Sequence, residues 1–214
     1  MIRRVCRSFV LTVTVLGGLA SHASAATITQ PLSNPSQLTN WDETQTFNRF
    51  DPSLGTLTQI DVQLDFAVSA DVQLENTTDA PSSSVVTWFP VFTLLRPDNT
   101  LILVAAPGYT DFGPTALLSA YDGTTDYGGS SGVTFTATRS DSRNATLLSP
   151  TDLALFSGIG TIGLPLFASM TGGGLTAAQI FTGFAGATVT LTYTYTPTAT
   201  PVPEPASLSL LGTT

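Results

Sequence analysis

Carboxylates in a glycine-rich stretch, residues 109–132, are the side chains whose type and spacing come closest to a metal site. Asp111, Asp122 and Asp126 stand there among glycines that can turn backbone carbonyls toward a cation. Calcium prefers such oxygen ligands, but the spacing matches no EF-hand loop. We therefore expect a surface turn without a metal or other cofactor, and we keep a calcium site as the alternative.

The first 25 residues have the organisation of a cleaved secretory signal. Arginines precede an apolar run of about a dozen residues, and Ala23 and Ala25 supply the small side chains that signal peptidase accepts. The run is shorter than the roughly 20 residues that cross a bilayer. We predict export by the general secretory route with cleavage after Ala25.

Cleavage would also remove the groups that most hydrolases use. The single cysteine, Cys6, and the single histidine, His22, both lie in the signal. Nucleophilic catalysis by serine or cysteine needs a base, commonly imidazole, and zinc sites usually need histidine or cysteine. A glycosidase-type carboxylate pair is the option that is left, but 15 acidic residues make some such pair inevitable, so its presence indicates nothing. We predict a protein without catalytic residues.

Charge and hydropathy restrict the partners and the fold. The chain after Ala25 has four arginines and no lysine against 15 acidic residues, a formal charge of −11. Such a surface cannot neutralise phosphates, so we exclude nucleic acid as a partner. The content of 42% hydrophobic residues is too high for a disordered acidic tail, so we expect a folded core without disulfides.

Strict alternation at residues 60–75 predicts a long strand, or two strands joined by a bend. Apolar side chains occupy the even positions from Ile60 to Leu74, and most odd positions are polar. One face of this strand should be dry and the other wet. The expected wet face carries Asp61, Asp65, Asp71 and Glu75.

Similar alternation recurs in short segments bounded by turn residues. These segments are residues 83–95, 99–106, 132–140, 158–170 and 186–197, with a hairpin turn expected at 96–100. Helical turns are expected only at 149–158 and 174–183. The pattern predicts an all-β fold, an antiparallel β-sandwich of jelly-roll or immunoglobulin-like type, with at most one or two short helical turns.

Aromatic side chains offer a second kind of site, because flat rings can stack on sugar rings. The candidates are Trp41, Trp88, Tyr109, Tyr121 and Tyr127. We expect Trp88 in the core, because it lies within an apolar strand, and we expect no shared aromatic platform.

The end of the chain resembles the start of a PEP-CTERM sorting signal, whose Pro-Glu-Pro element is present as Pro203, Glu204 and Pro205. The resemblance implies handling by an exosortase-type sorting enzyme in a Gram-negative bacterium that makes exopolysaccharide. The apolar run that follows is too short to span a bilayer, and no arginine cluster follows it. We expect an incomplete sorting element and release without a membrane anchor.

Residues 47–76 are similar to the opening of the choice-of-anchor E domain, and the similarity extends over roughly residues 40 to 196. The motif is the run from Asp51 to Leu57, before the alternating strand. Pro52 fixes a backbone angle and Gly55 permits a left-handed one, so Asp51 to Gly55 should form a tight turn. The resemblance implies an exported bacterial module, with no substrate and no catalytic residues.

The sequence thus predicts four segments: a signal peptide at 1–25, a choice-of-anchor E type β-sandwich at 26–195, a Pro/Thr-rich stalk at 196–202 and the sorting element at 203–214. The expected role is a non-catalytic component of the cell surface or extracellular matrix. The expected partners are signal peptidase, exopolysaccharide and, if the sorting element is complete in the native gene, an exosortase-type enzyme. The alternatives are a carbohydrate- or calcium-dependent binding module and, third, a glycoside-active enzyme.

Overall fold

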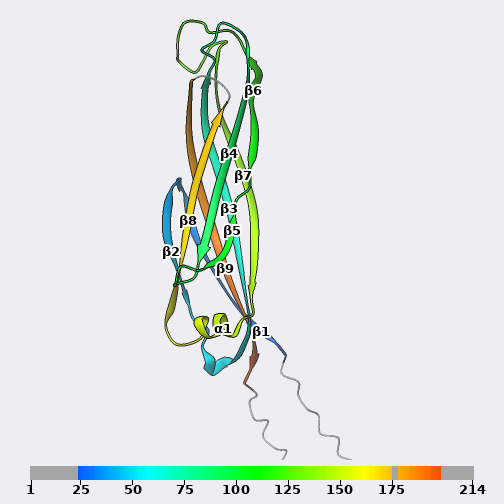
Figure 1. Cartoon of the computed structure of the whole chain (residues 1–214). Helices are drawn as coiled ribbons and strands as arrows, with labels where there is room; N and C mark the ends of the chain where they lie inside the picture. The colour runs from blue at the N-terminus through cyan, green and yellow to red at the C-terminus, as the bar shows by residue number, and fades with distance from the viewer. Residues whose placement is uncertain (1–23, 175–177, 199–214) are drawn as a thin grey trace, which may run out of the picture.

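A computed structural model describes residues 24–174 and 178–198 (Figure 1). These residues form strands, one α-helix and one 3-10 helix. In chain order, the elements are β1 (Ala26–Leu38), β2 (Trp41–Asn48), η1 (Pro52–Leu54), β3 (Gly55–Glu75), β4 (Ser82–Leu95), β5 (Leu101–Ala105), β6 (Tyr109–Leu118), β7 (Gly132–Leu147), α1 (Pro150–Phe156), β8 (Thr161–Gly174) and β9 (Ala178–Pro197).

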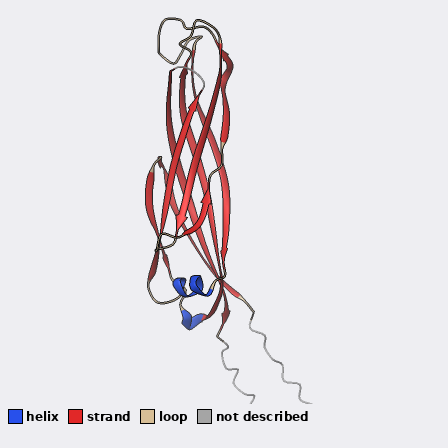
Figure 2. Ribbon diagram, in the orientation of Figure 1, coloured by secondary structure: helices blue, strands red, loops and turns tan. Residues whose placement is uncertain are grey.

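Two antiparallel sheets pack face to face into a long, narrow sandwich (Figure 2). The first, sheet A, has the strand order β1-β9-β3-β7. The second, sheet B, has the order β2-β8-β4-β5. The strand β6 also pairs with β4, along a different part of β4 from the part that pairs with β5. This order, in which the chain crosses repeatedly between the sheets, is that of a jelly roll. The all-β prediction is confirmed, and the connectivity selects the jelly roll from the two predicted types.

The predicted alternating strand is confirmed as β3, a single strand of 21 residues without a break. It pairs with β7 on one side and with β9 on the other, so it forms the centre of sheet A. Its even residues from Ile60 to Leu74 are all at most 3% exposed and contact the inner face of sheet B across the core. The β3 pattern therefore places a continuous apolar layer along the whole sandwich.

The predicted turn before β3 is present as η1. The Asp51 carboxylate accepts a hydrogen bond from the Ser53 backbone N–H at 2.8 Å, which caps η1, and Pro52 occupies its first position. Gly55 then has φ 152°, and a Cβ added there would lie 2.1 Å from the Thr196 carbonyl oxygen. Only glycine lets β3 begin this close to the end of β9.

An ion pair joins the β4–β5 hairpin to α1 at the base of the sandwich. Arg96 follows β4 and donates from Nε to Asp152 of α1 at 2.6 Å, and Asp152 is 8% exposed. Ser149 caps α1 and donates its hydroxyl to the same carboxylate. The predicted hairpin at 96–100 and the predicted helical turn at 149–158 are thereby confirmed and connected.

One prediction about local structure is wrong, and the predicted end of the sandwich needs extension. Residues 178–183 were expected in a helical turn but belong to β9, because their backbone pairs with β3 from Ala70 to Glu75. A ladder of this length outweighs local helical preference. The last strand also continues to Pro197, two residues beyond the expected end of the sandwich at 195. Within the described ranges, α1 and η1 are both far too short to cross a membrane.

We expect Gly55→Ala to lower the free energy of unfolding by about 1–3 kcal/mol, because the methyl group meets the Thr196 carbonyl and the backbone angle becomes strained. Urea unfolding of the two proteins measures the difference. Gly123→Ala is the control, since Gly123 also has a positive φ of 96° but has open space around it. Equal losses in the two variants would show that the close approach to Thr196 is unimportant.

We expect Asp152→Asn to lower the free energy of unfolding at pH 7 by about 1–3 kcal/mol, because a hydrogen-bonded charge pair is lost. The hydrogen bond from Arg96 lowers the pKa of Asp152. A lowered folded-state pKa stabilises the fold above the unfolded value of about 3.9, and this stabilisation disappears as the pH falls through the folded pKa. The deficit of the variant should therefore shrink below about pH 4.

Urea unfolding at pH 7, 4 and 3 measures this dependence. The matched control is Asp141→Asn, because Asp141 pairs with Arg143 at 2.8 Å on the surface. An exposed pair of this kind should contribute less than about 1 kcal/mol at any pH. A deficit of Asp152→Asn that stays constant from pH 7 to pH 3 would contradict the assigned role of the ion pair.

Candidate functional site

A row of small residues crosses the outer face of sheet A from edge to edge. Ala67 of β3 pairs with Gly186 of β9 and with Ser140 of β7, and Gly186 lies beside Ser36 in a bulge of β1. A Cβ on Gly186 would lie only 2.9 Å from the Ser36 backbone nitrogen. These four residues form the floor of a depression that we call the cross-strand groove.

The cross-strand groove consists of two open hollows of about 630 and 520 Å³. Both hollows are lined by Ser36, Ala67 and Ser140, so they join into one depression that runs perpendicular to the strands. Because adjacent strands lie about 4.8 Å apart, crossing four of them gives a length of about 14 Å. The groove thus extends from one edge of sheet A to the other.

The residues beside the floor on one side of the groove are polar. Asp65 of β3 pairs with Thr188 of β9 and with Ser142 of β7, which makes a row of a carboxylate and two hydroxyls that lines the groove. On the other side, Phe184 of β9 lies beside Ser69 of β3, but Phe184 itself lines neither hollow.

Two amide side chains lie between the sheets, on the inner side of β1. Asn34 pairs with the buried Ala187, so its side chain faces sheet B, and its carbonyl oxygen borders the groove beside Gly186. Gln45 of β2, 2% exposed, donates from Nε2 to Oδ1 of Asn34 at 3.0 Å. Nδ2 of Asn34 and Oε1 of Gln45 are buried without a partner among the described residues. The pair therefore belongs to the contact between the two sheets.

The outer face of sheet A is acidic and rich in hydroxyl groups. In the described strands, its outward positions carry Asp61, Asp65 and Asp71 and no lysine or arginine. Thr146 donates to Asp61, and Thr136 donates to Asp71, each at 2.7 Å. Arg139 reaches one end of the groove, but its guanidinium is paired with Asp111. The face should therefore repel anionic ligands.

The candidate calcium ligands do not converge. Asp111 lies on β6, where it accepts hydrogen bonds from Arg139 and, at 2.5 Å, from the indole of the fully buried Trp88. Asp122 and Asp126 lie in the tip loop after β6, where each accepts from a backbone N–H two residues further along. Among the described residues, no three acidic, histidine or cysteine side chains form a group suited to a metal.

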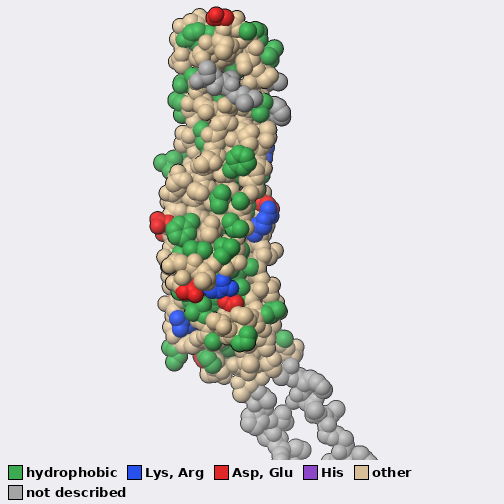
Figure 3. All heavy atoms as spheres, in the orientation of Figure 1, with side chains coloured by type: hydrophobic (Ala, Val, Ile, Leu, Met, Phe, Trp, Pro, Cys, Tyr) green, Lys and Arg blue, Asp and Glu red, His purple; other side chains and the backbone are tan. Residues whose placement is uncertain are grey.

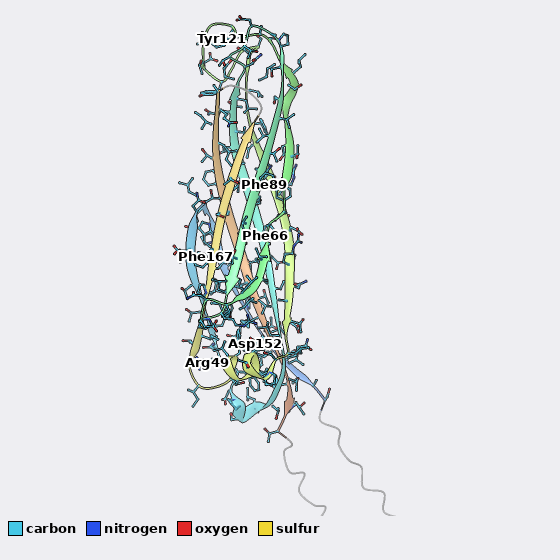
Figure 4. All side chains as sticks on the ribbon, viewed as in Figure 1. Arg49, Phe66, Phe89, Tyr121, Asp152 and Phe167 are labelled. Atoms are coloured by element: carbon cyan, nitrogen blue, oxygen red, sulfur yellow. The ribbon has the colours of Figure 1, made fainter. Side chains whose placement is uncertain are left out.

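Glu75 was expected on the wet face of β3, and that expectation is wrong. The side chain is 0% exposed, because the tip loop folds over the end of β3. Its Oε2 accepts a hydrogen bond from the Tyr127 backbone N–H at 2.7 Å, whereas Oε1 has no partner. A carboxylate thus helps to fix the loop at the tip of the sandwich, the end that Tyr121 marks in Figure 4.

The candidate aromatic residues are dispersed rather than coplanar. Trp88 is buried as expected and packs against Tyr109, with ring centroids 5.1 Å apart. Trp41 contacts Phe92 in the core and donates its indole N–H to the Ala185 carbonyl. Tyr121 and Tyr127 belong to the tip loop. No shared platform forms among these described residues.

The family motif and the processing motifs lie away from the groove. Asp51, Pro52 and Gly55 form the η1 turn at the base, where they have a structural role. Ala25 directly precedes β1. Ala23 and the sorting residues Pro203, Glu204 and Pro205 lie outside the described residues.

The outer face of sheet B differs in character. Figure 3 shows hydrophobic side chains exposed over the middle of this face, in the region of β4, β5 and β8. The exposed residues include Phe89, Leu101, Val104 and Phe167, which are each at least 40% exposed. Phe167 and Val104 both lie beside Thr93 of β4, so part of this apolar surface is continuous.

One sequence signal pointed to the cross-strand groove. Ala67 interrupts the polar series on the odd positions of β3, which otherwise carry acidic, amide or hydroxyl side chains from Gln59 to Glu75. A small residue on an outward position leaves a gap if its neighbours are also small. That condition depends on the register with β7 and β9, which the sequence did not reveal.

Comparisons with known proteins assign this chain to no family. No protein-family model and no curated protein matches this chain. Similar solved structures include that of infectious bursal disease virus strain Gx, at 14% identity over 82% of this chain and 37% of the viral chain, with a TM-score of 0.22. The D431N mutant VP2 protein of the same virus matches at 13% identity over 88% and 41%, with a TM-score of 0.25. The chain thus spans about two fifths of the length of these viral chains.

We expect Asp111→Ala to lower the free energy of unfolding by about 2–3 kcal/mol, because the Trp88 indole N–H and the Arg139 guanidinium both lose their partner. The tryptophan emission should also change, and a Trp41→Phe background isolates the signal of Trp88. Asp126→Ala is the control, because its carboxylate bonds a backbone N–H in the tip loop. An unchanged midpoint of urea unfolding for Asp111→Ala would refute this assignment.

Proposed function

We propose that this chain is an exported, non-catalytic β-sandwich of the bacterial cell surface or extracellular matrix. In this proposal, signal peptidase removes residues 1–25, and Pro203, Glu204 and Pro205 direct sorting by an exosortase-type enzyme wherever the sorting element that they begin is complete in the native gene. The resemblance to choice-of-anchor E domains and to PEP-CTERM signals supports the address. The setting would be a Gram-negative bacterium that makes exopolysaccharide.

The observation that carries the proposal is the placement of the two chain ends. β1 begins at Ala26, directly after the expected cleavage site, and Ala26 pairs with Tyr195 near the end of β9. Both described ends therefore leave the sandwich at its base (Figure 1). Removal of the signal peptide would leave every strand intact. A sorting element that follows β9 would extend from the base of the sandwich, and the sandwich would point away from that element.

The surface chemistry supports a role without catalysis. The outward carboxylates Asp61 and Asp71 each accept a hydrogen bond from a threonine of β7, and Asp65 accepts from Gln63. These contacts keep an acidic, hydroxyl-rich sheet soluble and hydrated, which suits contact with a polysaccharide matrix. A carbohydrate-binding module is the second candidate, and the cross-strand groove is the observation that favours it.

The first test is the processing of the full chain in an exopolysaccharide-producing Gram-negative host. We expect the exported protein to begin at Ala26, as intact mass and N-terminal sequencing would show. Ala25→Glu should accumulate as the uncleaved precursor, because signal peptidase needs a small residue there, whereas Ser24→Glu should be processed normally. Recovery of exported protein that still carries residues 1–25 would refute the assigned signal.

The same host with its exosortase gene deleted tests the sorting part of the proposal. Export and cleavage at Ala26 should continue, while the share of protein in the matrix fraction should fall. An unchanged distribution would limit the proposal to export alone. Release of sugar from the isolated matrix by the purified protein would overturn the non-catalytic role.

A further inference from the structure

We propose that the outer face of sheet B binds a second copy of this chain, so that two sandwiches pack face to face through β4, β5 and β8. The inference assigns an interaction surface and goes beyond the proposed function, because it rests on the sandwich and not on its address. Three features of the described strands carry it: the continuity of an apolar surface, the charge of the face and its area.

Apolar side chains form a continuous surface across three strands of sheet B. Phe167 of β8 and Val104 of β5 lie on either side of Thr93 of β4 in one row. Leu95 of β4 and Leu101 of β5 form the next row toward the base. Because side chains two residues apart on a strand face the same side, these two rows are neighbours. They make one surface, which we call the sheet B patch.

Phe89 extends the sheet B patch along β4 toward the tip of the sandwich. It lies on the same side of β4 as Leu95 and is 49% exposed. Figure 4 shows Phe89 nearer the tip than Phe167. Single exposed apolar residues are common on monomeric proteins, whereas contiguous groups of them mark interaction sites. The sheet B patch is such a group.

Charge favours a second copy as the occupant of this face. The chain has a formal net charge of −8, so two copies repel each other over most of their surface. The described outward positions of β4, β5 and β8 carry no acidic or basic residue, and Asp42 beside Phe167 lies on the edge strand β2. Sheet A, by contrast, presents Asp61, Asp65 and Asp71. Two copies can therefore approach closely through sheet B but not through sheet A.

An uncharged apolar face also selects the kind of partner. It offers no electrostatic attraction to a cationic or an anionic surface, so its partner must be apolar and nearly flat. The sheet B patch of another copy has both properties. Two identical patches related by a two-fold axis are complementary to each other, which is the usual arrangement in homodimers.

The area of the face is sufficient for a dimer. The outward residues from Val85 to Leu95 of β4 span about 34 Å, and the face is three to four strands wide, about 17 Å. Pairing two such faces would bury roughly 1,200 Å² in total, the lower end of the range for specific interfaces. Sheets pack face to face in this way within β-sandwiches, at a separation of about 10 Å. The dimer would repeat that packing between two chains.

Sedimentation of the purified full chain from about 1 µM to about 1 mM measures self-association. We expect a reversible monomer–dimer equilibrium with a dissociation constant in the micromolar range. Raising the salt concentration from about 0.05 M to about 1 M should strengthen the dimer, because salt screens the net repulsion and leaves apolar contacts intact. A chain that stays monomeric at about 1 mM, or a dimer that dissociates as salt is added, overturns the proposal.

Two variants locate the interface. Phe167→Asp and Val104→Asp each place a carboxylate in the sheet B patch and should raise the dissociation constant at least about a hundredfold. Both side chains point outward, at 40% and 49% exposed, so the core is untouched. The matched control is Leu38→Asp, because Leu38 is 62% exposed on β1 of sheet A. It should dimerise like the wild type.

Unchanged dimerisation of Phe167→Asp and Val104→Asp would place the interface elsewhere and refute the assignment. An equal loss in Leu38→Asp would refute it as well. All variants keep the apolar run of residues 1–25, so association through that run would persist in them and be recognised.

Crosslinking gives a check that leaves the apolar side chains in place. Thr93 lies at the centre of the sheet B patch, so a two-fold axis through the patch brings it near the same residue of the other copy. In a Cys6→Ser background, Thr93→Cys has a single thiol, and a short bis-maleimide reagent should join two chains. Thr190→Cys on the outer face of sheet A is the matched control. Equal crosslinking of the two variants contradicts the proposal.

A lipid surface is the other occupant that an apolar face accepts. Flotation with phosphatidylcholine vesicles compares the wild-type chain with Phe167→Asp. We expect the substitution to leave vesicle binding unchanged while it removes the dimer. Loss of vesicle binding in Phe167→Asp, by a chain that is monomeric without vesicles, would assign the face to lipid and overturn the proposal.

Discussion

The whole structure depends on the register of β3, which pairs along its length with β7 and with β9. Because side chains alternate across a strand, this register places every even residue from Ile60 to Leu74 in the core. A slip by one residue would move that apolar layer to the solvent. The burial of these residues therefore fixes the position of both neighbouring strands, and with it every row on the outer face of sheet A.

The edges of the same sheet show how such long strands avoid pairing with other chains. Sheet A ends at β7, whose Arg139, Asp141 and Arg143 occupy inward positions by register with β3. At the other edge, β1 contains Pro31 and Pro35 and a bulge before Gln37. Inward charges, proline and bulges all oppose edge-to-edge pairing. One of these features, the β1 bulge, also forms the end of the cross-strand groove.

The two outer faces of the sandwich differ in the side chains that they expose. Sheet A presents threonine, serine and aspartate around a groove, whereas sheet B exposes phenylalanine and valine above β4, β5 and β8. The polar face carries carboxylates and hydroxyl groups, and its described outward positions include no cation. The shared core thus supplies stability, while the outward residues give each face its own chemistry.

The sequence by itself determined the all-β class, the facing of the residues in β3, the η1 turn and the capped helix, because each follows from periodicity or from residues close in the chain. It failed for Glu75, since the loop that buries this residue lies about 50 positions away, and for residues 178–183, whose partner strand overrides local preference. Only the tertiary structure decided the jelly-roll order, the Asp111 contacts and the groove. Ser36, Ala67, Ser140 and Gly186 become neighbours through strand register, which no local pattern specifies.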